Sequence, residues 1–134
     1  MDAAFKTMAG RGGGQIINVA SVAAFTPRGA YSAHKAWLVN FSRWADLHYD
    51  DVNISVQALC PGFVRTEFHQ RGQMDISGVP RWMWLKADKV VAASLRDLDR
   101  DKTLSIPTAR YKVLATLAQY MPKSIVARAA KRGR

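Results

Sequence analysis

Two short apolar runs, rich in β-branched residues, predict buried strands at residues 15–21 and 54–60. Between them, residues 30–49 carry apolar side chains at helical spacing, which predicts one long helix with an apolar face. Strands that are apolar on both faces are typical of parallel sheets covered by helices. The order strand, helix, strand is the right-handed crossover unit of such a sheet. The pattern therefore predicts an α/β fold.

Weaker patterns continue this arrangement on either side. Residues 1–11 have the pattern of a helix end, which a glycine-rich turn terminates. After the second strand, residues 63–85 form an irregular segment that bears aromatic side chains, and Asp88 is a candidate cap for the helix that follows. The remaining predicted elements are helices at 86–98, 110–120 and 123–132, with Pro122 between the last two, and a third strand at 104–106.

Composition limits the class of protein. With 134 residues, 49% of them apolar, the chain can form one domain with a substantial core. No segment reaches about 18 uninterrupted apolar residues, and residues 1–11 lack the pattern of a secretory signal. Cys60 is the only cysteine, which excludes a disulfide within the chain and favours the reducing cytoplasm. The three histidines, His34, His48 and His69, are scattered, so we predict no metal site.

The formal net charge of +10 is concentrated at the C-terminal end. From Lys102 onward there are eight lysines and arginines and no acidic residue. Such a segment can bind nucleic acid or an anionic membrane surface, or it can simply be solvated. We favour a solvated tail and predict no nucleic-acid partner, because no aromatic platform accompanies the cations. Membrane contact through the basic helix at 123–132 is the weaker alternative.

The clearest chemistry lies at Tyr31 and Lys35, which open the predicted long helix. At a spacing of i, i+4 the two side chains lie on one face. A phenol normally loses its proton near pH ~10, and a cation held close favours the phenolate. The pair is therefore a candidate proton donor or acceptor for carbonyl and alcohol chemistry. The same spacing is common on ordinary helix surfaces, so the interpretation depends on the neighbouring motifs.

Two further features converge on the same place. Ser21 ends the first strand, and the segment PGFVRT at residues 61–66 follows the second. Parallel strands end at one edge of their sheet, so all three features lie at the carboxyl edge, where α/β proteins bind ligands. In the sequences IINVAS, YSAHK and PGFVRT, and in their order, the chain closely resembles the short-chain dehydrogenase/reductase family.

The resemblance implies a role for each matching residue. Tyr31 would be the acid/base that exchanges a proton with the substrate oxygen. Lys35 would favour the phenolate and hydrogen-bond the nicotinamide ribose, and Ser21 would donate a hydrogen bond to the substrate oxygen. The catalytic residues would thus be Ser21, Tyr31 and Lys35, and the cofactor-binding residues would be Tyr31, Lys35, Pro61, Gly62, Val64 and Thr66.

The resemblance also implies a function and partners. A member of this family would be an NAD- or NADP-dependent oxidoreductase that transfers a hydride between the nicotinamide and a small ketone or alcohol. The aromatic segment favours an apolar substrate. Helices that correspond to the long helix here often pair between subunits in the family, so the resemblance implies a homo-oligomer of the full-length form.

One departure from the family pattern narrows this interpretation. The family's TGxxxGxG turn, which holds the cofactor pyrophosphate, is not found, because the glycines at 10–14 precede a strand and form a helix-to-strand turn. We therefore expect the C-terminal part of a Rossmann-like doubly wound parallel sheet, about three strands with flanking helices, over residues 1–134. A basic helical extension would begin at about residue 108. Two hypotheses stay open: an oxidoreductase, or a truncated, non-catalytic remnant of one, for which a misplaced start site would be an equal explanation.

Some side chains keep two interpretations. Residues 82–84, Trp-Met-Trp, either line an apolar substrate pocket or pack as core. The aromatic residues Trp37, Phe41 and Trp44 form core or a subunit-contact face. Cys60 is expected to be a small buried side chain, because no base is placed to activate it.

Overall fold

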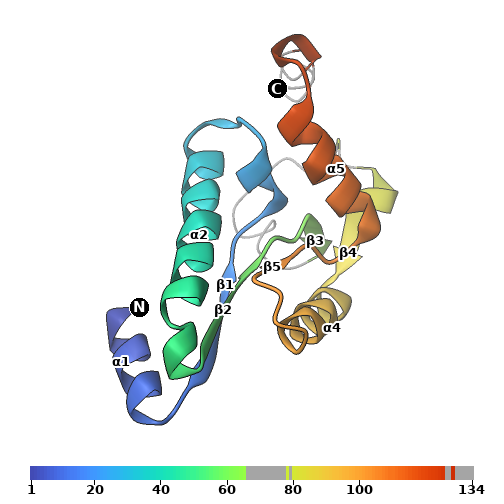
Figure 1. The fold of residues 1–134 in the computed structure, drawn as a ribbon. Coiled ribbons are helices and arrows are strands. Elements are labelled where there is room, and N and C mark those ends of the chain that lie inside the picture. Colours follow the sequence, from blue (N-terminus) through green and yellow to red (C-terminus); the bar gives the residue numbers. More distant parts are fainter. Residues whose placement is uncertain (66–77, 79, 126–127, 129–134) are drawn as a thin grey trace.

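A computed structural model of the chain describes residues 1–65, 78, 80–125 and 128. Helices, short 3₁₀ turns and strands alternate along it (Figure 1). The helices are α1 (Asp2–Gly10), α2 (Gly29–His48), α4 (Ala87–Leu98) and α5 (Ala109–Tyr120), and the 3₁₀ turns are η1 (Val22–Phe25), η2 (Asp50–Val52) and η3 (Arg81–Met83). The strands are β1 (Gly14–Val19), β2 (Ile54–Leu59), β3 (Phe63–Arg65), β4 (Trp84–Lys86) and β5 (Leu104–Ser105).

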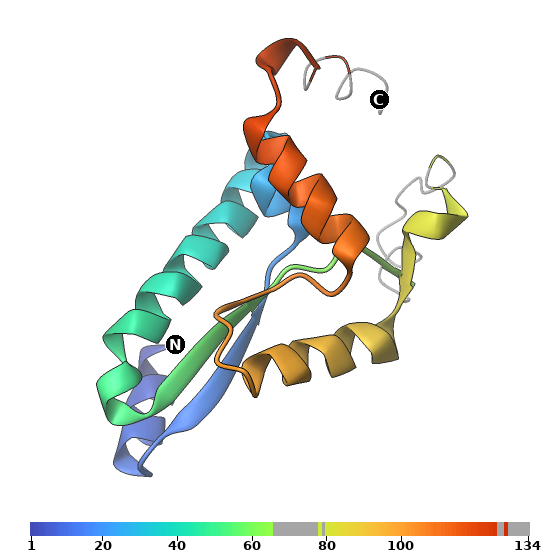
Figure 2. The ribbon, with the colours of Figure 1, turned by 45° about the vertical axis from the view of Figure 1, so that its right-hand side comes forward.

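The main sheet is parallel and has the order β1-β2-β5. Strands β1 and β2 pair along their whole length, from Gly14 opposite Ile54 to Val19 opposite Leu59. Helices α2 and α4 lie on opposite sides of this sheet (Figure 1), and α5 lies beyond the carboxyl ends of the strands (Figure 2). The predicted α/β class, with a parallel sheet and flanking helices, is confirmed.

Strand β2 explains how the two faces of the sheet are packed. Successive side chains of a strand point to opposite faces, so alternate residues share one face. Ile54 and Val56 pack with α1 and α2, and Ala58 continues this row into a second buried cluster with Cys60, next to the strand. The helix residues buried with this row are Phe5 of α1 and Val39 and Ala45 of α2.

The opposite face of β2 is held by a buried amide. Gln57 is fully buried, and its Nε2 donates to the backbone oxygens of Ser94, at 3.2 Å, and Lys102, at 3.1 Å. The Ser94 hydroxyl donates in return to Gln57 Oε1 at 2.6 Å. A buried amide is stable only when its polar atoms have partners. This network therefore fixes α4 and the start of β5 against the sheet.

The irregular segment predicted at 63–85 contains more order than expected. Its two ends form β3 and β4, which pair in parallel as a separate two-stranded sheet. Three-residue strands show no periodicity that a sequence pattern could reveal. Asp88 is not a cap either: the N-cap of α4 is Lys86, and Asp88 lies in the first helical turn. A side-chain cap occurs instead at α5, where the Thr108 hydroxyl accepts from the Tyr111 amide at 3.3 Å.

The glycine-rich segment is a helix-to-strand turn, as predicted. Gly12 and Gly13 have φ values of 87° and 139°, a conformation that L side chains rarely adopt. On α2, Trp37 and Trp44 are 60% and 49% exposed, so they lie on an outer face and not in the core. The basic helix predicted at 123–132 lies mostly outside the described residues. None of the described helices is long and apolar enough to cross a bilayer.

Candidate active site

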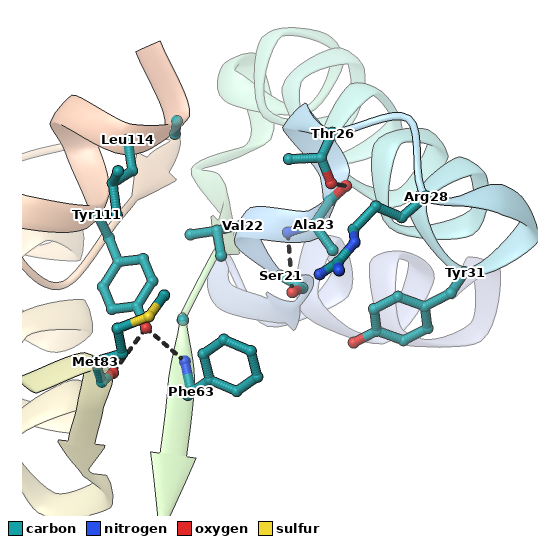
Figure 3. Close-up of a pocket in the computed structure, with 12 residues that line it drawn as sticks. Ser21, Val22, Ala23, Thr26, Arg28, Tyr31, Phe63, Met83, Tyr111 and Leu114 are labelled. Carbon is teal, nitrogen blue, oxygen red and sulfur yellow. Dashed lines mark hydrogen bonds between the residues drawn. The ribbon is translucent and has the colours of Figure 1, made fainter. Parts of the chain in front are cut away.

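A cavity of about 480 Å³ opens at the carboxyl end of the main sheet. One wall comes from the end of β1, from η1 and from the start of α2; the other comes from β3, η3 and α5 (Figure 3). Most of the lining is apolar. The lining residues are Ser21, Val22, Ala23, Thr26, Arg28, Tyr31, Gly62, Phe63, Met83, Tyr111, Leu114 and Ala115.

Ser21 leaves β1 in an extended conformation and caps η1. Its Oγ accepts a hydrogen bond from the Ala23 amide at 3.1 Å. A hydroxyl carries one hydrogen and two lone pairs, so this bond occupies a lone pair and leaves the O–H to donate. The backbone thereby holds Oγ in place at the cavity, which is the arrangement a hydrogen-bond donor to a substrate oxygen requires.

Tyr31 lies in the first turn of α2, and Lys35 lies one turn later on the same face. The ammonium of Lys35 is 5.7 Å from the centroid of the Tyr31 ring and donates to the Val19 carbonyl at 3.0 Å. Lys35 therefore ties α2 to the end of β1 while it keeps a positive charge near the phenol. Tyr31 is 56% exposed and lines the cavity, with its hydroxyl directed inward (Figure 3).

Only part of the segment that follows β2, residues 61–66, is seen to line the cavity. The Pro61 carbonyl accepts from the Val22 amide at 3.1 Å, which joins this segment to η1. Gly62 lines the cavity, and a Cβ at this position would overlap the Tyr111 ring. Val64 lies in β3, paired with Leu85, and neither it nor Pro61 is a lining residue. Thr66 lies outside the described residues.

Tyr111 of α5 closes the far wall and was not anticipated as a site residue. Its ring is buried against Gly62, and its hydroxyl accepts from the Phe63 amide at 3.1 Å and donates to the Met83 carbonyl at 2.7 Å (Figure 3). Burial raises the pKa of the Tyr111 phenol, although the Phe63 amide and the Arg110 charge oppose the shift. A neutral phenol is the form that can donate to a carbonyl.

The aromatic segment at 82–84 is divided between different environments. Met83 lines the cavity, whereas Trp82 is 53% exposed and outside the lining. The Trp84 ring lies 5.8 Å from the Phe63 ring, centroid to centroid. Arg28 is a further lining residue that the motifs did not indicate, although its place in the turn before Tyr31 was a usable signal.

Cys60 is adjacent to the site, but its thiol is not suited to act as a nucleophile. Its side chain is fully buried, and desolvation raises the pKa of the thiol to about 11, against opposing effects of the Ser21 backbone, Arg43 and Lys35. The thiolate needed for nucleophilic chemistry is therefore not formed near neutral pH. Within the described ranges, no three His, Cys, Asp or Glu side chains are grouped as metal ligands.

Comparison with known proteins adds family information to this geometry. A family model described as short chain dehydrogenase matches residues 1–76. An uncharacterized oxidoreductase of Haemophilus influenzae is 37% identical over 78 residues, which cover 56% of this chain and 27% of that protein. Dehydrogenase/reductase SDR family member 4 of Bos taurus is 39% identical over 64 residues, covering 46% of this chain and 23% of the other.

Solved structures show the same architecture over most of the described fold. A short-chain dehydrogenase from Sphingobium yanoikuyae in complex with NADPH has a TM-score of 0.70 and 29% identity, and the match covers 89% of this chain and 48% of that one. The bulky-bulky ketone specific alcohol dehydrogenase from Comamonas testosteroni has a TM-score of 0.65 and 28% identity, covering 89% and 46%. The chain thus spans about half the length of these structures, and 27% of the Haemophilus relative.

Proposed function

The chain belongs to the short chain dehydrogenase family, and from that membership we propose that its protein transfers a hydride between a nicotinamide cofactor and a ketone or alcohol. The observation that carries the proposal is the shared wall of Ser21 and Tyr31 in an apolar cavity. One side chain offers a hydroxyl donor, the other offers a phenol, and Lys35 places a positive charge beside the phenol. These are the groups that carbonyl reduction needs around the substrate oxygen.

The chain's own residues account for the proton side of the reaction. In the reductive direction, Ser21 donates a hydrogen bond to the carbonyl oxygen and stabilises the negative charge that develops there. Tyr31 transfers its phenolic proton to that oxygen, while the Lys35 ammonium lies 5.7 Å from the centroid of the Tyr31 ring. In the oxidative direction the Tyr31 phenolate accepts the alcohol proton. The apolar side chains of Phe63 and Met83 line the cavity beside these groups.

The donor groups also fit the nicotinamide end of a cofactor. Lys35 uses one of its three N–H donors on Val19, which leaves two for ribose hydroxyls. When bound, a reduced nicotinamide supplies the hydride. Lys35, Tyr31 and the backbone of residues 61–64 would hold this group. The related short-chain dehydrogenase from Sphingobium yanoikuyae was solved in complex with NADPH. Titration of the protein with NADPH and NADH tests which cofactor it prefers.

The substrate that we propose is a ketone that carries an apolar chain, or the corresponding alcohol. The cavity walls are formed largely by carbon, and the related Comamonas enzyme is specific for bulky-bulky ketones. An apolar cavity of this kind gains affinity from the hydrocarbon area it removes from water.

The decisive experiment is Tyr31→Phe, which removes the proton donor and keeps the ring. Turnover of an apolar ketone with NADPH or NADH should fall by roughly 10²- to 10⁴-fold, the usual contribution of a positioned acid or base. Tyr120→Phe is the matched control, because that tyrosine is 81% exposed on α5 and should leave turnover unchanged. Unaltered turnover in Tyr31→Phe, with unfolding temperatures equal for all three proteins, would contradict the proposal. Absence of NADPH and NADH binding would favour a non-catalytic remnant.

A further inference from the structure

The lining of the cavity contains one charged side chain, Arg28, among the residues that the structure describes around it. No aspartate or glutamate accompanies Arg28 in that lining. The proton-transfer proposal assigns no role to this guanidinium. Arg28 is solvent-exposed, and it lies at the wall of a largely apolar cavity where it can meet the charged end of a bound ligand.

The backbone fixes where Arg28 emerges. Arg28 is the N-cap residue of α2, and its amide donates to the Thr26 carbonyl at 3.0 Å. The next residue, Gly29, has a φ of 75° and turns the chain into the helix. Figure 3 shows the guanidinium directed into the cavity on the wall that carries Ser21 and Tyr31. The apolar side chains of Met83 and Leu114 lie across from it.

The electrostatic surroundings favour an anion at this position. In the part of the chain that the structure describes, the guanidinium has no carboxylate partner. The first turn of α2 contains no acidic residue, so the positive end of the helix dipole adds to the charge of Arg28. Lys35 supplies a further positive charge close to Tyr31. A guanidinium presents planar, paired N–H donors that match the two oxygens of a carboxylate.

We propose that Arg28 selects substrates in which a carboxylate adjoins the reacting carbonyl and an apolar chain extends from the other side: apolar 2-oxo acids and the corresponding 2-hydroxy acids. The reaction rests on the proposed function, whereas the ligand class rests on the cavity. In the reductive direction the hydride goes to the carbonyl carbon and the Tyr31 proton goes to its oxygen. The carboxylate stays unchanged at Arg28, and the hydrocarbon chain packs toward Met83 and Leu114.

Binding tests the ligand class without turnover. Calorimetric titration at low salt compares 4-phenylbutanoate with 4-phenylbutanamide, which has the same apolar chain but no charge. The wild-type protein should prefer the carboxylate by about tenfold, the scale of one charge-assisted hydrogen-bonded pair near solvent. Arg28→Gln should abolish the preference, and Arg28→Lys should keep part of it. Arg96→Gln removes an exposed arginine of α4 outside the cavity and should keep all of it.

Turnover tests the two proposals separately. The substrate pair is 2-oxo-4-phenylbutanoate and 4-phenylbutan-2-one, in which a methyl group replaces the carboxylate. The ratio of kcat/KM for the oxo acid to that for the ketone should fall about tenfold in Arg28→Gln and stay constant in Arg96→Gln. If neither compound is reduced but Arg28→Gln loses the carboxylate preference in binding, the proposed function fails and the ligand class stands. Equal binding of carboxylate and amide by the wild-type protein, or a preference that survives Arg28→Gln, would overturn the role of Arg28.

Discussion

The two walls of the cavity are built in different ways. The wall that carries Ser21 and Tyr31 grows from the β1-α2-β2 unit, in which six residue pairs of a parallel ladder and two buried clusters support one another. The opposite wall comes from α5 and the small β3-β4 sheet, whose strands have three residues each. On that side, the buried phenol of Tyr111 in α5 hydrogen-bonds to Phe63 of β3 and to Met83 of η3, and it thereby joins three separate segments.

This difference assigns different tasks to the two walls. The proposed proton-transfer groups lie on the β1-α2-β2 unit, whose paired strands and buried clusters support the fixed geometry that such a site requires. The opposite wall determines the shape of the cavity, and its position depends on Tyr111 and Gly62. We therefore expect substitutions in the sheet to affect folding, and substitutions near Tyr111 to affect the shape of the cavity more than the chemistry.

The largest loss of stability should come from Gln57→Ala, which breaks the hydrogen bonds between β2 and α4. The substitution creates a cavity and leaves the Ser94 hydroxyl without its acceptor. We expect a loss of about 3 kcal/mol in the free energy of unfolding, measured by denaturant titration. Gln15→Ala on β1 is the control, since this glutamine is exposed and should change stability by less than about 0.5 kcal/mol. Equal effects of the two substitutions would show that the buried network contributes little.

Gly62→Ala tests the contact between the two walls. The added Cβ overlaps the Tyr111 ring, so α5 or β3 must move, at a cost of about 2 kcal/mol of stability. Turnover should fall at the same time because the cavity changes shape. Gly10→Ala is the matched control: a Cβ there meets nothing within 4 Å, and the position is helical. A stable Gly62→Ala protein with normal turnover would contradict the close packing.

Tyr111→Phe removes the hydroxyl and keeps the ring. The Phe63 amide and the Met83 carbonyl each lose a partner, so stability should fall by about 1 kcal/mol. Because Tyr111 positions the wall and takes no part in proton transfer, KM for an apolar ketone should rise more than kcat falls. Tyr120→Phe, on the same helix but exposed, should do neither. A loss confined to kcat would contradict this assignment and would indicate that Tyr111 takes part in the chemical step.

The smallest expected effect is a change in the pH dependence of stability, and it comes from Asp97 at the end of α4. Asp97 accepts from Lys102 at 2.9 Å and from Ser105 at 2.8 Å. Partial burial works against ionisation, but these donors and the charges of Lys102 and Lys112 outweigh it and hold the pKa of Asp97 below its ordinary value. The ionised carboxylate therefore stabilises the fold fully above the unfolded pKa, about 3.9, and this contribution disappears as the pH falls through the lower folded value.

The test compares Asp97→Asn with Asp99→Asn, a change at an exposed neighbour on the same helix end. Asp97→Asn should reduce stability by less than about 1 kcal/mol at neutral pH and flatten its decline in acid. Asp99→Asn should leave the acid decline unchanged. Parallel pH profiles for wild type and Asp97→Asn would refute the linkage.

Much of the α/β frame could be predicted from the sequence. The long helix was expected at residues 30–49 and forms at Gly29–His48, and the second strand was expected at 54–60 and forms at Ile54–Leu59. Ser21, Tyr31 and Gly62 line one cavity. Their chemical roles, and the roles of Lys35, Pro61, Val64 and Thr66, stay predictions that the Tyr31→Phe experiment begins to test.

Other features could not be predicted, because they depend on contacts between distant segments. The β3-β4 pairing joins strands too short to show a period. Tyr111 reaches Gly62, Phe63 and Met83 only after α5 has folded over the strand ends.

By itself the sequence determined the elements and the local spacing of the reactive groups. Apolar periodicity and turn residues act over short distances, and they place Ser21 at a strand end and Tyr31 one turn before Lys35. Only the tertiary structure decided what surrounds those groups: the Tyr111 wall, the Arg28 guanidinium in the cavity and the buried Gln57 network. Such contacts depend on packing between segments far apart in the chain, and local patterns do not encode their geometry.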